Sequence, residues 1–137
     1  MNKLFSAIAV IILMASCSKK NDVIEAVQEQ TANSSFFRDA NLAIANMVAS
    51  NSNGKVQINF TTVYEKNITK IEVMAGDSPN YLCSIYESAP TGNSSQAKAY
   101  SVIDATPKAT TMYYMIRYSL ANGDWGYTSV LKFQRGN

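Results

Sequence analysis

Hydrophobic and polar residues alternate along the chain from about residue 42 to near its end. In 55–61, for example, Val56, Ile58 and Phe60 are separated by polar neighbours. A two-residue period is typical of a strand with one buried face, because successive side chains point to opposite sides of a sheet. Seven short segments show this period or are rich in aromatic residues: 42–48, 55–61, 70–74, 81–86, 100–104, 113–120 and 127–133. The first of these also permits a helix, because it is rich in alanine.

Turn-forming residues separate these segments. Five short polar stretches contain Gly, Pro, Asn or Glu: 51–54, 65–67, 76–80, 106–108 and 122–124. The Asn122-Gly123 pair is the strongest hairpin signal, because both residue types readily adopt positive φ. Seven short strands without a long helical period predict an all-β domain over residues 41–137, a seven-stranded sandwich of immunoglobulin type. The same pattern argues against a parallel α/β architecture.

The first sixteen residues have the layout of a secretory signal peptide. Lys3 provides a positive charge near the start of the chain. The uncharged run Leu4–Met14 has eleven residues, too few to cross a hydrocarbon core of about 30 Å. Residues 1–16 are therefore expected to direct export and then to be removed.

The residues that follow this run carry a further signal. Ala15 and Ser16 are small and directly precede Cys17. This arrangement resembles the lipobox of bacterial lipoproteins, with Met14 at a position where leucine is more usual. The resemblance implies that Cys17 becomes the mature N-terminus and carries a diacylglycerol on its thiol, a stable membrane anchor. Ser18 stands where aspartate favours inner-membrane retention in some bacteria, so the outer membrane is the expected location.

Residues 17–40 read as a polar tether between the lipid and the domain. The stretch is rich in Asn, Gln, Ser and charged residues, and a helix as short as 22–30 would be marginal in water. Phe36-Phe37 is the exception. These rings are expected to pack on the edge of the domain, and contact with a membrane or a partner is the alternative.

The second half of the chain resembles a known domain family. The resemblance is carried by Ala99–Asp104, Thr106-Pro107, Tyr113–Tyr118, Asn122–Asp124 and Tyr127–Val130. These segments are similar to the back half of the fibronectin type III-like domains found in secreted and surface proteins of gliding-type Gram-negative bacteria. The match extends over 54–133 and is looser in its first part.

The fibronectin type III resemblance implies two packed sheets, A-B-E and C′-C-F-G. It makes Tyr114 the candidate corner tyrosine, with its ring inward and its hydroxyl bonded to backbone upstream. Phe60 stands where many such domains have a buried tryptophan, and Met115 replaces the usual arginine, with Arg117 nearby. Membership of this kind implies a fold and leaves the function open.

The amino-acid composition limits the catalytic and binding functions that are open to this chain. The chain contains no histidine, and its net charge is +2, which provides no electrostatic basis for binding nucleic acid. No nucleophile, zinc or phosphate-binding motif is present. A carboxylate pair or calcium site formed by Asp104 and Asp124 is the remaining catalytic or metal hypothesis, and the dispersed aspartates argue against it. With Cys17 lipidated, Cys83 is expected to be an unpaired, buried thiol, with an intermolecular disulfide as the alternative.

The candidate binding residues are aromatic. Trp125, Tyr113 and Tyr127 fall on or beside the hairpin at 122–124, where large, stiff rings suit contact with a protein or a glycan. Cross-strand packing is the competing explanation for the tyrosines. We therefore expect a non-catalytic, lipid-anchored envelope protein without a cofactor that acts as a binding or structural module. The alternative is a periplasmic inhibitor or accessory subunit of an envelope hydrolase.

Overall fold

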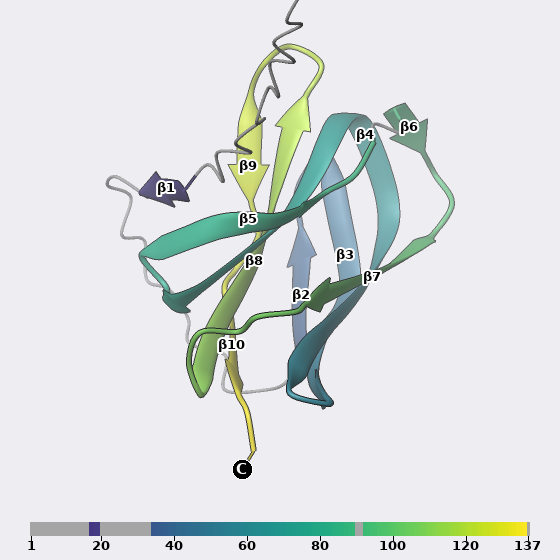
Figure 1. Ribbon diagram of the computed structural model, residues 1–137. Coiled ribbons are helices and arrows are strands. Elements are labelled where there is room, and N and C mark those ends of the chain that lie inside the picture. The colour runs from purple at the N-terminus through teal and green to yellow at the C-terminus, as the bar shows by residue number, and fades with distance from the viewer. Residues whose placement is uncertain (1–16, 20–33, 90–91, 137) are drawn as a thin grey trace, which may run out of the picture.

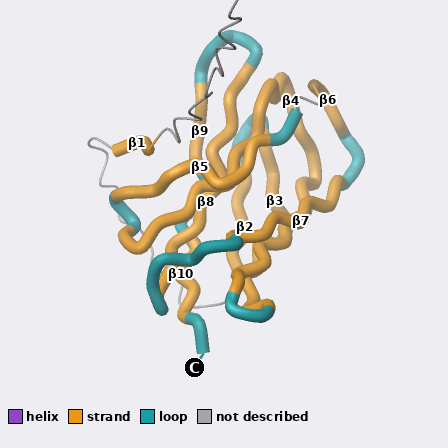
Figure 2. Tube along the Cα trace, in the orientation of Figure 1, coloured by secondary structure: helices purple, strands orange, loops and turns teal. Residues whose placement is uncertain are grey.

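The computed structural model describes residues 17–19, 34–89 and 92–136. These residues form ten β-strands and no helix, so the predicted all-β class is confirmed (Figures 1 and 2). The strands are β1 (Cys17–Lys19), β2 (Ser34–Arg38), β3 (Leu42–Ser52), β4 (Lys55–Ser78), β5 (Tyr81–Glu87), β6 (Gly92–Ser94), β7 (Lys98–Asp104), β8 (Thr111–Leu120), β9 (Trp125–Tyr127) and β10 (Leu131–Gln134). All their pairings are antiparallel.

The 24-residue strand β4 organises the sheet. Its first half pairs with β3 on one side and β7 on the other, from Val56 to Thr62. Its second half pairs with β5 and β8. We call β2, β3, the first half of β4 and β7 the first arm. The second arm consists of β5, the second half of β4, β8, β9 and β10. Figure 1 shows the sheet curling so that the two arms face each other.

The chain passes between the arms without leaving the strand. The sequence predicts a turn at Glu65–Asn67, whereas β4 continues through these residues. Asn67 adopts a positive φ of 55°, and the register with β8 shifts between Ile68 and Lys70. Short β6 pairs with β4 at Glu65 and Ile68, so the bend keeps backbone partners. The predicted turn is therefore a bend within one strand.

Alternating residues of both arms form the main core. Val56, Ile58 and Phe60 are buried, as the two-residue period predicts, and the Phe60 ring stacks on Tyr100 at 4.6 Å. Eighteen buried residues belong to this cluster, and the largest apolar ones from the two arms include Leu42, Ile44, Met47, Ile71, Tyr114, Ile116 and Leu131. Burial of apolar side chains from both arms in one cluster holds the curled sheet together.

A second, smaller apolar cluster lies on the outer face of the second arm. It contains Met74, Leu82, Met115 and Val130, with Tyr113 and Tyr127 partly buried against it. Consecutive β4 residues from Ile71 to Ala75 are all buried, because this part of the second arm is covered on both faces. The two-residue alternation in the sequence predicts that only one of those faces is buried.

Part of the predicted tether belongs to the sheet. Ser34–Arg38, which the sequence places in the tether, form β2 and pair with β3. Phe37 packs against the core near Tyr118, with ring centroids 6.4 Å apart, whereas Phe36 is 60% exposed. The leader 1–16 and residues 20–33 lie outside the described residues. In the described part of the chain, no helix has the length and apolar character needed to cross a membrane.

Candidate functional site

The hairpin between β8 and β9 forms where Asn-Gly predicts it. Gly123 has a φ of 90°, and its amide donates to the Leu120 carbonyl at 3.0 Å. The Leu120 amide in turn donates to the Asp124 carbonyl at 2.7 Å. The Asp124 carboxylate accepts from the Asn122 side chain at 2.7 Å. These bonds define the turn that carries Trp125 at the start of β9.

Trp125 and Tyr127 lie together on the outer face of the second arm. The Trp125 side chain is 62% exposed, the largest fraction among the large apolar residues described. Its ring meets the Tyr127 ring edge-on, with centroids 4.9 Å apart and an interplanar angle of 63°. Tyr127 is half-buried against the second cluster. The tryptophan is therefore exposed but supported from one side by a fixed ring, a geometry suited to contact with a ligand.

Tyr113 does not join this pair. Its backbone lies opposite Gly76 and Lys132, whereas Trp125 lies opposite Ser119 on the same strand β8. Six strand positions at about 3.3 Å each separate the two places by about 20 Å. Like Tyr127, Tyr113 packs on the second cluster, but it lies away from the exposed ring of Trp125. The structure thus brings two of the three predicted binding residues together.

A buried ion pair lies next to Tyr127. Arg117, which is opposite Tyr127 in the sheet, donates from Nε to Glu72 Oε2 and from Nη2 to Glu72 Oε1, both at 2.6 Å. Lys70 Nζ lies 3.4 Å from the same carboxylate, which is only 1% exposed. Sequence alternation marks Glu72 as a solvent-facing residue, and its partner is 45 positions away in the chain. The pair was therefore not predictable from local pattern.

The Glu72 carboxyl is ionised in this setting. Burial alone raises its pKa, but the hydrogen bond and charge of Arg117, with smaller contributions from Glu87 and Lys70, lower the pKa below its usual value. The pKa of Arg117 is raised, chiefly by its hydrogen bond to Glu72 and against the effect of burial. The two groups form a fixed, charged support under the aromatic pair. With both carboxylate oxygens occupied, Glu72 is not available as a proton acceptor for a substrate.

A second buried carboxylate, Glu65, lies in the first arm. It is 0% exposed, and its Oε1 accepts from Thr62 Oγ1 at 2.8 Å and from the Tyr100 hydroxyl at 2.6 Å. Lys98 Nζ lies 3.1 Å from Oε2. All four side chains belong to β4 and β7, where register brings Thr62 opposite Lys98. This polar cluster stabilises the bend and presents no free catalytic group.

Tyr114 is buried with its ring inward, as the sequence predicts. Its hydroxyl, however, donates to the side chain of Asp104 at 3.0 Å rather than to backbone. Burial, followed by the charge of Asp104, raises the pKa of Tyr114 far above its usual value. Asp104 also accepts from the Thr106 amide at 3.2 Å. A buried carboxylate ten residues upstream therefore replaces the expected backbone acceptor.

Asp104 and Asp124 do not form a pair. The Asp104 carboxylate accepts from Tyr114 near the start of β8. The Asp124 carbonyl accepts from the amide of Leu120, at the other end of that strand. Six residues of extended chain separate these points, or about 20 Å. Among the described residues no group of three or more His, Cys, Asp or Glu is placed to hold a metal ion. The structure therefore gives the carboxylate-pair hypothesis no support.

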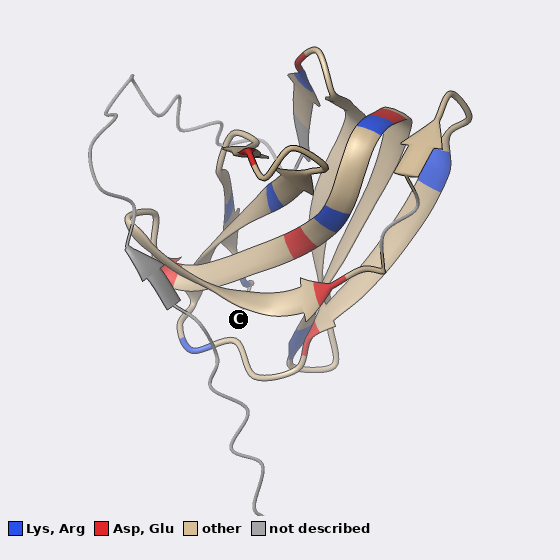
Figure 3. Ribbon diagram, turned by 90° about the horizontal axis from the view of Figure 1, so that it is seen from above, with Lys and Arg blue, Asp and Glu red and all other residues tan. Residues whose placement is uncertain are grey.

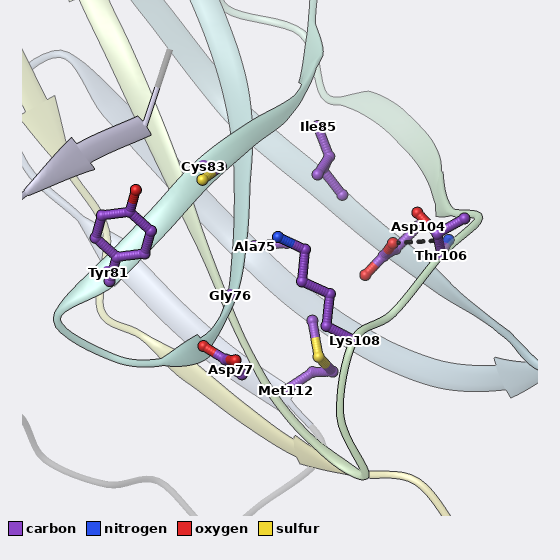
Figure 4. Close-up of a pocket in the computed structure, with 10 residues that line it drawn as sticks. All are labelled: Ala75, Gly76, Asp77, Tyr81, Cys83, Ile85, Asp104, Thr106, Lys108 and Met112. Atoms are coloured by element: carbon purple, nitrogen blue, oxygen red, sulfur yellow. Dashed lines mark hydrogen bonds between the residues drawn. The ribbon is translucent and has the colours of Figure 1, made fainter. Parts of the chain in front are cut away.

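A cavity of about 300 Å³ opens between β5 and the β7–β8 connection (Figure 4). Its lining includes Ala75, Ile85 and Met112 as apolar residues and Asp77 and Lys108 as charged residues. In Figure 4 the Lys108 side chain extends across the cavity toward Ala75. The lining combines both charges with small apolar patches. It brings no nucleophile and base together.

Cys83 also lines this cavity, and it is disulfide-bonded. It is half-buried, so the expected unpaired and buried thiol is not found. The backbone of Cys17 lies opposite Cys83 in the pairing of β1 with β5. A sulfur atom that carries a lipid thioether cannot also join a disulfide. The bonded state of Cys83 and lipidation of Cys17 therefore compete if the bond lies within one chain, which has two cysteines in all.

Charge is distributed rather than concentrated on the described surface. Figure 3 shows basic and acidic residues close together along β4 and scattered over the other strands. Comparison of the chain with protein-family models, with curated proteins and with solved structures found no match. The assignment of a role therefore depends on the sequence and on the geometry described above.

Proposed function

We propose that this chain is a non-catalytic lipoprotein of the bacterial cell envelope whose fibronectin type III-like sandwich binds a partner through Trp125 and Tyr127. The strand pairings support the fold assignment. The set β3, first half of β4 and β7 has the order of sheet A-B-E, and the set β5, second half of β4, β8 and β9–β10 has the order of sheet C′-C-F-G. The inward ring of Tyr114 at the start of β8 agrees with a corner tyrosine, although its hydroxyl donates to the side chain of Asp104 rather than to backbone.

The exposure of Trp125 is the observation that carries the binding proposal. With 62% of its surface exposed, Trp125 forgoes the apolar burial that the fold provides to rings such as Phe60, Tyr114 and Phe133. Rigid aromatic side chains are enriched at binding hot spots, because they contribute large contact area at low entropy cost. A flat ring supported by Tyr127 suits stacking on a sugar face or insertion into a protein pocket.

The single tryptophan of the chain makes this proposal testable by fluorescence. Soluble cell-wall oligosaccharides and an envelope protein extract are titrated against the purified protein, and binding at Trp125 shifts its emission. The Trp125→Ala variant is then compared with Phe36→Ala in capture after mild crosslinking. Phe36 is a matched control, because it is 60% exposed and belongs to β2 in the first arm, whereas Trp125 belongs to the second arm. Equal capture by both variants would contradict the proposed site.

Lipidation of Cys17 has its own test. Cells expressing the protein are fed a labelled fatty acid, and the parent chain is expected to take up label that Cys17→Ser loses. Cys83→Ser should retain full labelling, because the lipid requires no disulfide. Intact mass of the parent chain distinguishes the two states directly, since a diacylglycerol adds mass whereas an intramolecular disulfide removes two hydrogens. An unlabelled parent with a mass lower by two hydrogens would overturn the anchor.

Protease treatment of intact and lysed cells locates the domain, with a tag at the C-terminus. Cleavage on intact cells supports a surface module that captures protein or glycan. Protection until lysis places the domain in the periplasm and favours the inhibitor or accessory-subunit role. In both cases the outer membrane is the expected site of anchoring, in line with Ser18 after the acceptor cysteine.

A further inference from the structure

Strand β7 has one edge that no other strand covers in the described part of the chain. All seven residues of β7 pair with β4 in an unbroken register from Thr62–Lys98 to Val56–Asp104. Among the described residues its second edge has no neighbouring strand. Such an edge is a template for pairing with another strand.

Other exposed edges are modified in ways that discourage pairing. β2 has a register irregularity between Ser35 and Phe37 and ends in Arg38. β5 is covered at its edge by β1, and β9 and β10 have only three and four residues. Bulges, terminal charges, covering strands and short length are the devices by which proteins protect sheet edges. In β7 the stretch Ala99–Ile103 has no charge, no proline and no bulge.

The outward side chains of β7 are compatible with a close neighbour. Ala99, Ser101 and Ile103 are exposed, and Ile103 has 54% of its surface free. On the same face, β4 contributes the uncharged Gln57 and Asn59, and Gln57 Nε2 donates to Ser101 Oγ at 3.1 Å. No like charges oppose an added strand here.

We propose that two copies of this chain associate by antiparallel pairing of β7 with β7 around a two-fold axis at Ser101. In that register Ser101 faces Ser101 of the second copy, and each Ala99 faces an Ile103, so a small side chain meets a large one. Lys98 likewise meets Asp104, so the strand complements itself in size and in charge, as an interface with two-fold symmetry requires. This self-complementarity identifies a second copy as the occupant. The inference is independent of the role proposed for Trp125.

The charged ends of β7 do not obstruct this pairing. Lys98 Nζ lies 3.1 Å from Glu65, and Asp104 accepts from Tyr114 at 3.0 Å, so both charges have partners within their own chain. The two-fold register also sets Lys98 of one copy opposite Asp104 of the other. The edge therefore brings neither an unpaired charge nor a like-charge pair into the interface.

Cysteine crosslinking tests the register. Across the axis the two Ser101 Cα atoms would lie about 4.5–5.5 Å apart, within the range that a disulfide spans. Ser101→Cys is therefore expected to give a disulfide-linked dimer on a non-reducing gel. Asn59→Cys is the matched control, because Asn59 is exposed on the neighbouring strand, opposite Ser101, and its copies would lie about 14 Å apart. The parent chain gives the background from the native cysteines.

A charge swap tests association without a crosslink. Two differently tagged copies are mixed, and co-capture is measured for the parent, Ser101→Lys and Ser101→Glu. Each variant alone places like charges on the axis and should lower co-capture about tenfold, whereas mixing the Lys with the Glu variant should restore it. Equal crosslinking of the Ser101→Cys and Asn59→Cys variants, or co-capture of the parent that Ser101→Lys leaves unchanged, overturns the proposal. A parent that shows no co-capture overturns it as well.

Discussion

The two arms of the sheet each bury one glutamate of β4, and they do so differently. Glu65 in the first arm is neutralised by a single lysine, with two hydroxyls completing its shell. Glu72 in the second arm has a bidentate arginine and a nearby lysine. The first arrangement shares the charge over neutral donors, whereas the second concentrates it in one ion pair. The comparison shows that burial of a carboxylate depends on its full set of donors rather than on one countercharge.

Removal of the arginine is expected to have the largest effect. Arg117→Met leaves Glu72 buried beside Lys70 alone and should lower the free energy of unfolding by about 3 kcal/mol, because an uncompensated buried charge is costly. Urea denaturation measures the change. The double variant Arg117→Met/Glu72→Met should recover most of the loss. A single variant within about 0.5 kcal/mol of the parent would show that the pair is not needed.

Loss of one hydroxyl in the first arm should have a smaller effect. Tyr100→Phe keeps the ring stacked on Phe60 but removes one donor from Glu65. A hydrogen bond to a charged group contributes about 1.5–3 kcal/mol, and the remaining Thr62 and Lys98 contacts favour the lower value. Thermal unfolding of this variant beside Tyr86→Phe, whose ring also packs on the core, separates the hydroxyl from general effects. Equal losses in both would contradict a specific role.

Acid should weaken the second arm. The pKa of Glu72 is lower in the folded protein than its ordinary value of 4.5. Its contribution to stability is therefore complete above pH 4.5 and is lost as pH falls through the folded pKa, by at most about 1.4 kcal/mol per pH unit. The difference in unfolding free energy between the parent and Arg117→Met/Glu72→Met should be constant near neutrality and change only below pH 4.5. A change between pH 6 and 8 would contradict this assignment.

Removal of the lysine in the second arm should have the smallest effect. The Lys70 side chain is 35% exposed, and Glu72 keeps its bidentate arginine without it, so the loss in Lys70→Met should be about 1 kcal/mol or less. Raising the salt concentration should reduce the difference between variant and parent. A loss as large as that of Arg117→Met would show that the arginine is not the main partner of Glu72.

Much of the fold could be predicted from the sequence where the signal was local. Alternation located Val56, Ile58 and Phe60 in the core, and Asn-Gly located the β8–β9 hairpin. Both depend only on neighbouring residues. Exposure of Trp125 at that hairpin follows from the same local reasoning.

The remainder depends on distant residues. Glu65 falls in a predicted polar turn, and Glu72 is a surface residue in the alternating pattern. Only the placement of Tyr100 and Arg117 makes their burial possible. The second apolar cluster has the same origin, because Met74 is buried by residues from β5, β8 and the β9–β10 segment. The inward ring of Tyr114 agrees with the prediction, but its acceptor does not, since the sequence suggested Asp104 only as a turn residue or as a partner of Asp124.

The continuity of β4 has a consequence for how the chain folds. Both partners that complete its two halves, β7 and β8, are synthesised after it, and Val56 meets Asp104 only when a loop of almost fifty residues closes. Neither arm can form from the N-terminal part of the chain alone. Such non-local topology is associated with folding on the millisecond-to-second scale and with loss of both arms in one cooperative step. Each new chain therefore remains unfolded until β8 has been synthesised.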